Sequence, residues 1–259
     1  MQVCGKILES LGRYIVLVLK VFGIIFTNPP PWALVREQMY SIAVMSLPVV
    51  AVTGFSTGMV LSAQSFFQLA DKGLTGATGL MVAKAMFTEM GPILTAFMVT
   101  GRVGSAMCAE LGTMNVTEQI DALRSMAVNP LRYLIAPRFI AGITALPLLT
   151  VFSNLMGLFG GFIVAVFFFK MQPNRFYDPI ADHISHFDFS VGLFKALFFG
   201  ILIITISCYK GMRVKGGAAG VGEATTKSVV ISYSCILISN FILTLAMNLV
   251  YQYMYRTVI

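Results

Sequence analysis

The sequence predicts an all-α, polytopic membrane protein with an N-terminal interfacial helix, five transmembrane helices and a short cytoplasmic helix. Hydrophobic residues make up 57% of the 259 residues and charged residues only 11%, with a mean hydropathy of +0.83. A soluble globular chain has roughly 25% charged residues, so this chain has too few to cover its surface in water. The apolar residues also fall in blocks of about 20 or more, the length that crosses a hydrocarbon core roughly 30 Å thick.

The net charge of +7 does not indicate a nucleic-acid partner. The basic residues lie beside apolar blocks, with no dense basic face and no RNA-binding motif. That distribution is typical of membrane proteins, whose cytoplasmic loops carry most of the Lys and Arg. We therefore expect no binding to nucleic acid.

Residues 1–27 predict a helix that lies in the membrane interface. Lys6, Arg13 and Lys20 recur at every seventh position, which keeps them on one helical face. The apolar residues largely opposite them are Leu8, Leu11, Ile15, Val18, Phe22 and Ile25. The alternative is a sixth span, which three charges in about twenty residues disfavour. Three successive prolines end the helix at residues 29–31, because proline lacks an amide hydrogen.

The transmembrane region is predicted at about residues 41–255. Its five spans are expected at about 41–67, 80–107, 134–169, 191–209 and 229–255. The connections 110–133 and 210–228, with the N-terminal segment, hold ten of the 18 Lys and Arg residues, whereas the connections 68–79 and 170–190 hold three. We therefore place the N-terminus in the cytoplasm and the C-terminus outside it, and we expect a single domain over residues 1–259.

Two small-residue motifs predict close packing between spans. Gly54 and Gly58 lie four apart in the first span, and Gly157, Gly160 and Gly161 lie in the third. Such spacing lets helix backbones approach closely. The motifs indicate either an internal packing face, which is the default interpretation, or a dimer seam.

The outer half of the first span is unusually polar. Its polar residues are Ser56, Thr57, Ser62, Gln64 and Ser65. Polar side chains rarely face lipid, so we expect this half to line a cavity.

Glu89 is a carboxylate deep in the second span, three residues before Pro92. Intramembrane acids usually face a cavity or a partner, because an ionised carboxylate is costly in hydrocarbon. Pro92 has no amide hydrogen for the carbonyl of Thr88, so we expect a kink and a free acceptor beside Glu89. Glu89 is either a functional group or makes a structural contact with a polar group such as Arg102 on the same helix.

The polar stretch 110–130 contains a predicted short helix at about residues 116–127. Asn115 followed three residues later by Glu118 is typical of a helix start. The apolar residues of this helix recur at spacing three, at Ile120, Leu123 and Met126. A helix of about a dozen residues is marginal alone in water, so it needs a surface on which to dock. That surface is either the membrane or a cytoplasmic protein, and the charge of the helix favours the protein.

Two other motifs do not predict sites. Residues 215–227 are glycine-rich, but Glu223 and Ala224 stand where a phosphate loop needs Lys and Ser or Thr, and we expect a flexible loop. An aromatic-rich outer loop contains side chains of metal-ligand type at Asp178, Asp182, His183 and His186. Their pattern is weak, and we expect no metal site there. No catalytic constellation lies beside a credible cavity, so we do not expect an enzyme.

Several motifs in register along the chain resemble the MlaE/YrbE family of ABC transporter permeases. They lie at residues 89–92, 101–112, 117–119, 126–131, 137–139 and 220–230, and the resemblance covers nearly the whole chain. It implies a permease subunit that moves phospholipid between the membranes of Gram-negative bacteria and resides in the inner membrane. It also implies a homodimer, an ABC ATPase subunit that carries ATP and Mg, and a periplasmic MCE-domain lipid-binding protein.

The resemblance also implies roles for individual residues. The helix at 116–127 is then the coupling helix seated in the ATPase, and its candidate residues are Glu110, Thr117, Glu118, Gln119, Ile120, Leu123 and Arg124. Candidate lipid-cavity residues are Leu61, Gln64 and Leu69, and candidate intramembrane polar residues are Glu89 and Arg102. No cofactor is expected in this chain.

Thr88 departs from the resemblance, because many relatives have arginine just before the glutamate of the Glu-x-Gly-Pro motif. An ion pair between such an arginine and Glu89 is therefore not available. Two rival functions stay open: an ion-coupled secondary transporter that uses Glu89, and a membrane scaffold that anchors a cytoplasmic partner without transport. The first predicts transport without an ATPase, and the second predicts that bulky substitutions at Leu61 or Leu69 leave lipid traffic unchanged.

Overall fold

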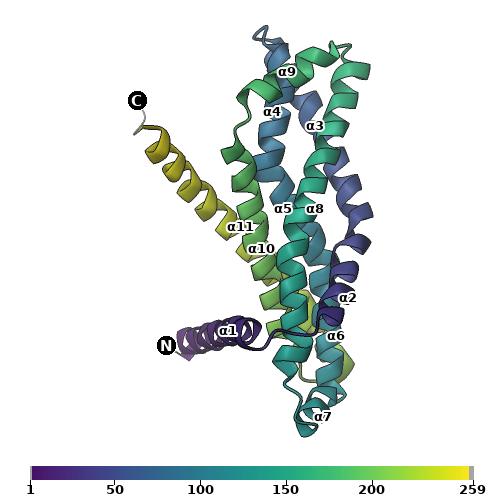
Figure 1. The fold of residues 1–259 in the computed structure, drawn as a ribbon, viewed down its shortest axis with the longest axis vertical. Coiled ribbons are helices and arrows are strands. Elements are labelled where there is room, and N and C mark those ends of the chain that lie inside the picture. The colour runs from purple at the N-terminus through teal and green to yellow at the C-terminus, as the bar shows by residue number, and fades with distance from the viewer. Residues whose placement is uncertain (1, 257–259) are drawn as a thin grey trace. The chain divides into compact units, whose positions relative to one another are not determined.

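The computed structural model describes residues 2–256, and side chains from residue 9 and residues 12–253. The regular structure of these residues is helical (Figure 1). The α-helices are α1 (Gln2–Thr27), α2 (Trp32–Ile42), α3 (Leu47–Ala70), α4 (Thr78–Ala85), α5 (Gly91–Val99), α6 (Ser105–Val116), α7 (Gln119–Ser125), α8 (Ala136–Ile163), α9 (Pro173–His183), α10 (His186–Gly211) and α11 (Gly217–Arg256). Short 3-10 or π segments are η1 (Val44–Ser46), η2 (Thr75–Ala77), η3 (Met86–Met90), η4 (Thr100–Gly104), η5 (Leu131–Ile135) and η6 (Val164–Phe168).

Five helical segments among the described residues are long and apolar enough to cross a membrane. They are Trp32–Ala70, Thr75–Val116, Leu131–Phe168, His186–Gly211 and Gly217–Tyr253. Each predicted span overlaps one of them, so the prediction of five membrane-spanning helices is confirmed at the level of length and composition.

The fifth segment begins much earlier than predicted. Residues 215–227 were expected to form a flexible loop, but α11 starts at Gly217. Gly216 and Gly217 have φ of 93° and 67°, a left-handed conformation that glycine adopts without a steric penalty. The loop prediction is wrong because these two glycines complete the turn, and the remaining small residues then continue as helix. Glu223 and Lys227 form an ion pair one turn apart on its surface.

The described residues pack into two compact units, each built from three separate stretches of chain. Unit 1 is Met1–Ile42, Thr100–Ile143 and Ile201–Tyr233, and unit 2 is Ala43–Val99, Thr144–Gly200 and Ser234–Ile259. Since neither unit is continuous in sequence, they are packing groups, and the single domain over residues 1–259 stays a prediction.

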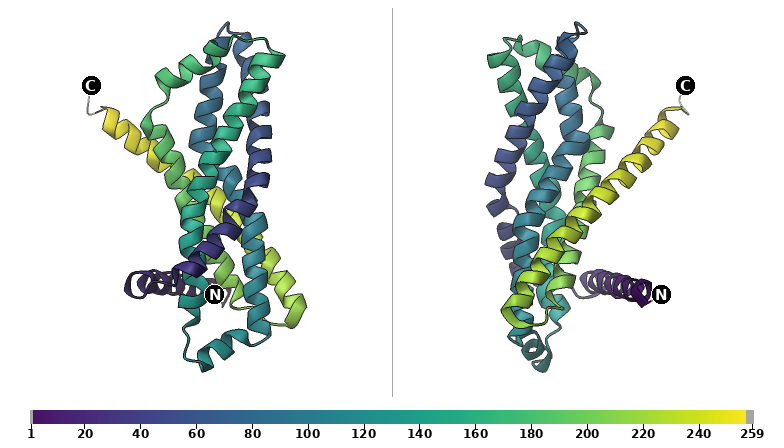
Figure 2. Two further views of the ribbon diagram at one scale, coloured as in Figure 1. Left: turned by 45° about the vertical axis from the view of Figure 1, so that its right-hand side comes forward. Right: turned by 180° about the vertical axis from the view of Figure 1, so that it is seen from behind.

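In unit 2, α3 and α8 pack backbone to backbone through the two glycine motifs. A Cβ atom added to Gly58 would lie 1.8 Å from the carbonyl oxygen of Gly157. The Ser62 hydroxyl donates a hydrogen bond of 2.8 Å to the carbonyl oxygen of Gly161. Figures 1 and 2 show the two helices side by side. The default interpretation, an internal packing face, is confirmed.

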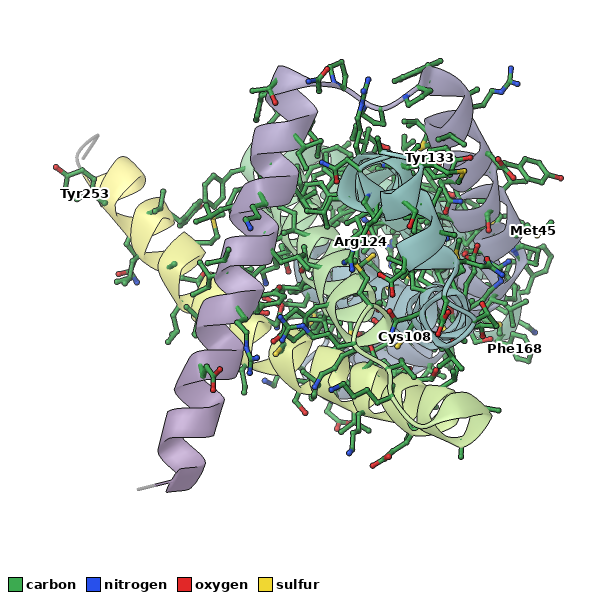
Figure 3. All side chains as sticks on the ribbon, turned by 90° about the horizontal axis from the view of Figure 1, so that it is seen from below. Met45, Cys108, Arg124, Tyr133, Phe168 and Tyr253 are labelled. Carbon is green, nitrogen blue, oxygen red and sulfur yellow. The ribbon has the colours of Figure 1, made fainter. Side chains whose placement is uncertain are left out.

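In unit 1, α1 lies crosswise to α6 and to the start of α8, as Figure 3 shows from below. Aromatic contacts attach it: the rings of Phe22 and Phe139 lie 4.9 Å apart, and those of Tyr14 and Tyr209 lie 5.6 Å apart. A helix crosswise to spanning helices runs along the membrane plane, which supports the interfacial prediction. The side chains of three residues used in that prediction lie outside the described residues: Lys6, Leu8 and Leu11.

Candidate functional site

Unit 2 contains a buried ion pair between Glu89 and Lys195. Lys195 Nζ lies 2.6 Å from Glu89 Oε1; the lysine side chain is fully buried, and the glutamate side chain is 31% exposed. The same ammonium donates to the hydroxyl oxygen of Thr244 at 2.8 Å and to the carbonyl oxygen of Thr88 at 3.1 Å. A lysine ammonium has three N–H donors, so each of them has an oxygen acceptor.

Two residues of α11 complete the surroundings of Glu89. The side-chain amide of Asn240 donates to Glu89 Oε2 at 3.0 Å, and the Thr244 hydroxyl lies 3.0 Å from Oε1. The pair therefore joins η3, α10 and α11 within unit 2. Charges this deep in an apolar unit are tolerated when they are paired and their remaining lone pairs are hydrogen-bonded.

Pro92 explains why the Thr88 carbonyl is available to Lys195. Proline has no amide hydrogen to donate to the carbonyl four residues earlier. Residues Met86–Met90 form a single π turn, and a Gly91 N–H bond to the Met86 carbonyl closes it. The predicted free acceptor beside Glu89 is thus confirmed, and the Lys195 ammonium occupies it.

Glu89 does make a structural contact with a polar group, but its partner is Lys195 and not Arg102, which was the example given for that alternative. The Arg102 guanidinium donates to the carbonyl oxygen of Ser41 at 3.2 Å, whereas the cation at Glu89 is Lys195. The threonine at position 88 also does not deprive Glu89 of an ion pair, because α10 supplies the cation.

The ion pair borders a cavity of about 230 Å³ in unit 2. Its wall combines charged or amide side chains with apolar ones. They include Lys84, Asp188, Lys195, Asn248, Val191 and Met247. The cavity is smaller than the roughly 300–1,000 Å³ of a drug-sized ligand pocket, and its mixed wall suits one small ionised group beside an apolar chain.

Asp188 in this wall also fixes the start of α10. The Ser185 amide donates to Asp188 Oδ2 at 3.2 Å, and the Asp188 amide lies 3.3 Å from the Ser185 hydroxyl oxygen, which accepts its hydrogen bond. This reciprocal arrangement is a capping box. It sets the register of α10, the helix that carries Lys195 into the ion pair.

In unit 1, the polar helix predicted at 116–127 is α7, which covers only Gln119–Ser125. α6 continues to Val116, and Glu118 follows it with a left-handed φ of 59°. The predicted cap is wrong: the Asn115 side-chain amide donates to the carbonyl oxygen of Val214 at 2.9 Å. A tertiary contact thus uses the side chain that the sequence pattern assigned to a helix start.

α7 is mostly exposed. Ile120 is its buried residue, at 2% exposure, and Leu123 is half-buried. The other predicted coupling residues of this segment are exposed: Thr117, Glu118, Gln119 and Arg124. Figure 3 labels Arg124 on α7, and its guanidinium pairs with Asp121 at 2.8 Å. The helix is anchored by one apolar side chain and presents a polar surface.

Glu110 ties the two helices that lead into and out of this segment. Its Oε2 lies 2.9 Å from the Arg138 guanidinium, so α6 is joined to α8. The Arg138 side chain is 4% exposed and also donates to the carbonyl oxygen of Leu134, whereas the Glu110 side chain is 58% exposed. The pair holds both ends of the α7 segment together within unit 1.

Comparison with known proteins identifies the family. The family described as "Permease MlaE" matches residues 35–246. The chain belongs to the MlaE permease family. The family match confirms the resemblance. Together with the five apolar helical segments, it identifies the chain as a multi-pass membrane protein.

Relatives of the MlaE permease family are similar to this chain over most of its length. A "Probable ABC transporter permease protein" of Rickettsia bellii is 36% identical over 239 residues, which is 92% of each chain. A probable ABC transporter permease of Synechocystis is 39% identical over 208 residues, 80% of this chain and 79% of its own. The "Intermembrane phospholipid transport system permease protein MlaE" of Haemophilus influenzae is 35% identical over 231 residues, 88% of each chain.

The candidate lipid-cavity residues of this MlaE permease lie on α3. Leu61 and Leu69 are half-buried and Gln64 is exposed. They are not among the described residues that line the cavity beside Glu89. The polarity of the span is partly explained by packing, since Ser62 donates to α8. Contact between lipid and these three residues stays a prediction.

Sequence reasoning missed three members of the ion-pair cluster: Lys195, Asn240 and Thr244. Lys195 lies inside the fourth apolar block, so the argument that singled out Glu89 also applies to it. Asn240 and Thr244 lie four residues apart, on one face of α11. The sequence shows that both residues are polar, but it does not show that both contact the Glu89 carboxylate.

Proposed function

We propose that this chain is the permease subunit of an ABC transporter that moves phospholipid between the inner and outer membranes of a bacterium. The observation that carries the proposal is the similarity to the Haemophilus protein, which is named for intermembrane phospholipid transport and aligns over 88% of both chains. The permease supplies the lipid path, and a separate ATPase, which binds ATP and Mg, supplies the energy.

In this proposal α7 is the coupling helix. Its exposed polar residues suit a protein surface better than hydrocarbon, since each polar group buried in lipid without a partner is costly. The Glu110–Arg138 pair supports transmission of a push on α7, because it ties the two helices that enter and leave the segment. The ATPase thus acts on α6 and α8 together.

The cavity beside Glu89 and Lys195 has a chemistry compatible with part of a phospholipid. Lys84 supplies positive charge for a phosphate, because Glu89 already neutralises Lys195, and Val191 and Met247 supply apolar surface for the start of an acyl chain. At about 230 Å³ the cavity is too small for a whole phospholipid. In the proposal it contacts a headgroup while the acyl chains extend outside it.

The location and assembly are part of the same proposal. The excess of Lys and Arg near the N-terminus and in the connections 110–133 and 210–228 supports a cytoplasmic N-terminus and a periplasmic C-terminus in the inner membrane. Two copies of the chain form the permease, and a periplasmic MCE-domain lipid-binding protein exchanges phospholipid with it.

Affinity purification in mild detergent tests the coupling assignment. The tagged chain should recover an ATPase with a Walker motif, and the purified complex should transfer phospholipid between vesicles only with ATP. Glu118→Lys or Leu123→Asp should lower ATPase recovery about tenfold or more, since a charge at a docked surface opposes its partner. Asp71→Lys, a charge reversal at an exposed residue just after α3, is the matched control and should retain the ATPase.

Three outcomes would contradict parts of the proposal. Transport driven by a proton gradient without an ATPase would establish the ion-coupled alternative. An ATPase that stays bound in both α7 variants would remove the coupling role. Recovery of the ATPase without any transfer of lipid would favour the scaffold.

A further inference from the structure

A groove of about 510 Å³ lies between α1 and other parts of unit 1. One face of α1 forms much of it, because residues spaced three, four and seven apart lie on the same side of a helix. The groove residues with a direct bearing on ligand chemistry are Glu9, Arg13, Val16, Leu17 and Lys20 of α1, Leu131 of η5, and Arg213 after α10.

The charged residues give the groove a net positive charge. Arg13, Lys20 and Arg213 are cations, and Glu9 is the one carboxylate among the described lining residues. Glu9 pairs with Arg13 at 3.3 Å, but both side chains are more than half exposed, so this pair is weak and readily rearranged. Two positive charges therefore remain after Glu9 is counted against one cation.

Arg213 is held in place by an aromatic pair. Its guanidinium donates to the Tyr209 hydroxyl oxygen at 2.7 Å, and its central carbon lies 4.3 Å from the centre of the Tyr209 ring. The Tyr209 ring packs against Tyr14 of α1, whose hydroxyl lies 2.5 Å from that of Thr205. The cation opposite α1 is thus positioned by the same contacts that attach α1 to unit 1.

The apolar residues of the groove lie between its cations. Val16 and Leu17 stand between Arg13 and Lys20 along α1, and Leu131 of η5 also lines the groove. Val16 is 49% exposed, and its neighbours Ile15 and Leu19 are also exposed. An exposed apolar strip flanked by cations is typical of helices that lie at the surface of an anionic membrane.

We propose that this groove binds an anionic phospholipid of the surrounding membrane, with phosphatidylglycerol chemistry. Its phosphodiester lies among Arg13, Lys20 and Arg213, and its acyl chains pass Val16, Leu17 and Leu131. A zwitterionic lipid carries its own ammonium beside the phosphate, so the net positive groove favours the anionic lipid. An arginine guanidinium suits the phosphate because it can donate two parallel hydrogen bonds.

This lipid is a resident ligand and differs from the transported cargo. By contacting both α1 and Arg213, it would hold α1 against the rest of unit 1. The inference rests on the membrane location in the proposed function and does not depend on ATP-driven transport.

Native mass spectrometry of the complex that contains this chain tests the proposal. The complex is purified in detergent and placed in nanodiscs of phosphatidylcholine alone, or of phosphatidylcholine with about a fifth phosphatidylglycerol, and the lipid that stays bound is then identified. Each basic residue near an anionic lipid contributes about fivefold to binding, so the triple variant Arg13→Gln/Lys20→Gln/Arg213→Gln should lose roughly a hundredfold in phosphatidylglycerol retention. Lys227→Gln is the matched control: Lys227 is exposed, pairs with Glu223 one turn away as Arg13 does with Glu9, and lies outside the groove lining.

The single variant Lys20→Glu tests the proposal without disturbing Tyr209. Lys20 is exposed, so the fold should be retained. Phosphatidylglycerol retention should fall at least fivefold in Lys20→Glu, whereas the separate variant Lys20→Arg keeps the charge and should retain the lipid as the wild type does. Equal retention of the two lipids by the wild type, or an equal loss in Lys227→Gln, would overturn the proposal. Competition by soluble glycerol phosphate at the same concentration as the lipid would show an anion site without a lipid site. An inactive transporter that still selects phosphatidylglycerol would count against the proposed function alone.

Discussion

The two units each contain an ion pair in which the cation is buried, but the anions differ. In unit 2, Glu89 is largely enclosed, and Lys195 satisfies all three of its N–H donors. In unit 1, Arg138 is nearly as buried as Lys195, yet Glu110 is 58% exposed. Among the described residues, each network has one buried atom without a hydrogen-bond partner, Asn240 Oδ1 in the first and Arg138 Nε in the second. We call the first pair the closed network because every N–H of its cation has an acceptor and its anion is largely enclosed, whereas the second pair has one side open to water or to a partner.

The comparison predicts a different cost for breaking each pair. A buried charge that loses its partner cannot recover its hydration, so the loss is large. An exposed carboxylate recovers most of its hydration, so the loss is small. The closed network therefore contributes mainly to the integrity of unit 2, and the open pair leaves a carboxylate available to the partner proposed for α7.

The largest effect is expected from Lys195→Met. It leaves Glu89 without a cation, which should lower the free energy of unfolding by roughly 3–5 kcal/mol, as measured by denaturant unfolding in detergent. Glu89→Gln/Lys195→Met removes both charges and should be more stable than the single variant. If Lys195→Met were as stable as the wild type, water would have to solvate the unpaired Glu89, and the network would not be closed.

An intermediate effect is expected from Gly58→Ala in the packing face of unit 2. The added Cβ would meet the Gly157 carbonyl oxygen at 1.8 Å, so α3 and α8 must separate, at a cost of about 1–3 kcal/mol. Gly222→Ala is the matched control, because nothing lies within 4 Å of its added Cβ. That helical position should gain up to about 1 kcal/mol in the same unfolding measurement. Equal stability of the two variants would contradict the close backbone contact.

The smallest effect is expected from Arg138→Met, which removes the buried cation and leaves the exposed Glu110 carboxylate. Water replaces part of the interaction that Glu110 loses, so the free energy of unfolding should fall by about 1 kcal/mol or less. Thermal unfolding of this variant and of Lys195→Met, measured under the same conditions, compares the losses of stability of the two pairs directly. A loss as large as that of Lys195→Met would mean that Glu110 is as enclosed as Glu89.

The fold could be predicted from the sequence where the physics is local. Apolar length located the five spans, and the missing amide hydrogen of Pro92 located the free carbonyl of Thr88. Lys195 could have been singled out as an intramembrane charge. That it meets Glu89 could not, because the two residues are 106 positions apart and only the packing of α10 brings them together.

Two capping patterns show where local reasoning fails. Ser185 and Asp188 form a real capping box at the start of α10, whereas Asn115 and Glu118 have the same spacing and form none. The difference is tertiary: the Asn115 amide reaches the Val214 carbonyl, and α6 continues past the predicted start. A local sequence pattern makes a helix cap possible, and the tertiary contacts of the same side chain determine whether the capping hydrogen bond forms.

The coordination of Lys195 has a consequence for any anion that reaches the cavity. Its ammonium already has as many oxygen ligands as it has hydrogens, so a phosphate oxygen cannot simply add to it. Binding there must be a substitution, in which Glu89, Thr244 or the Thr88 carbonyl is released as the anion enters. Release of Thr88 would return an unbonded carbonyl to η3, and release of Glu89 would leave a carboxylate beside the incoming negative charge. The Thr244 hydroxyl is uncharged and still donates to the carbonyl oxygen of Asn240 at 2.8 Å after its release, which makes it the least costly of the three to exchange.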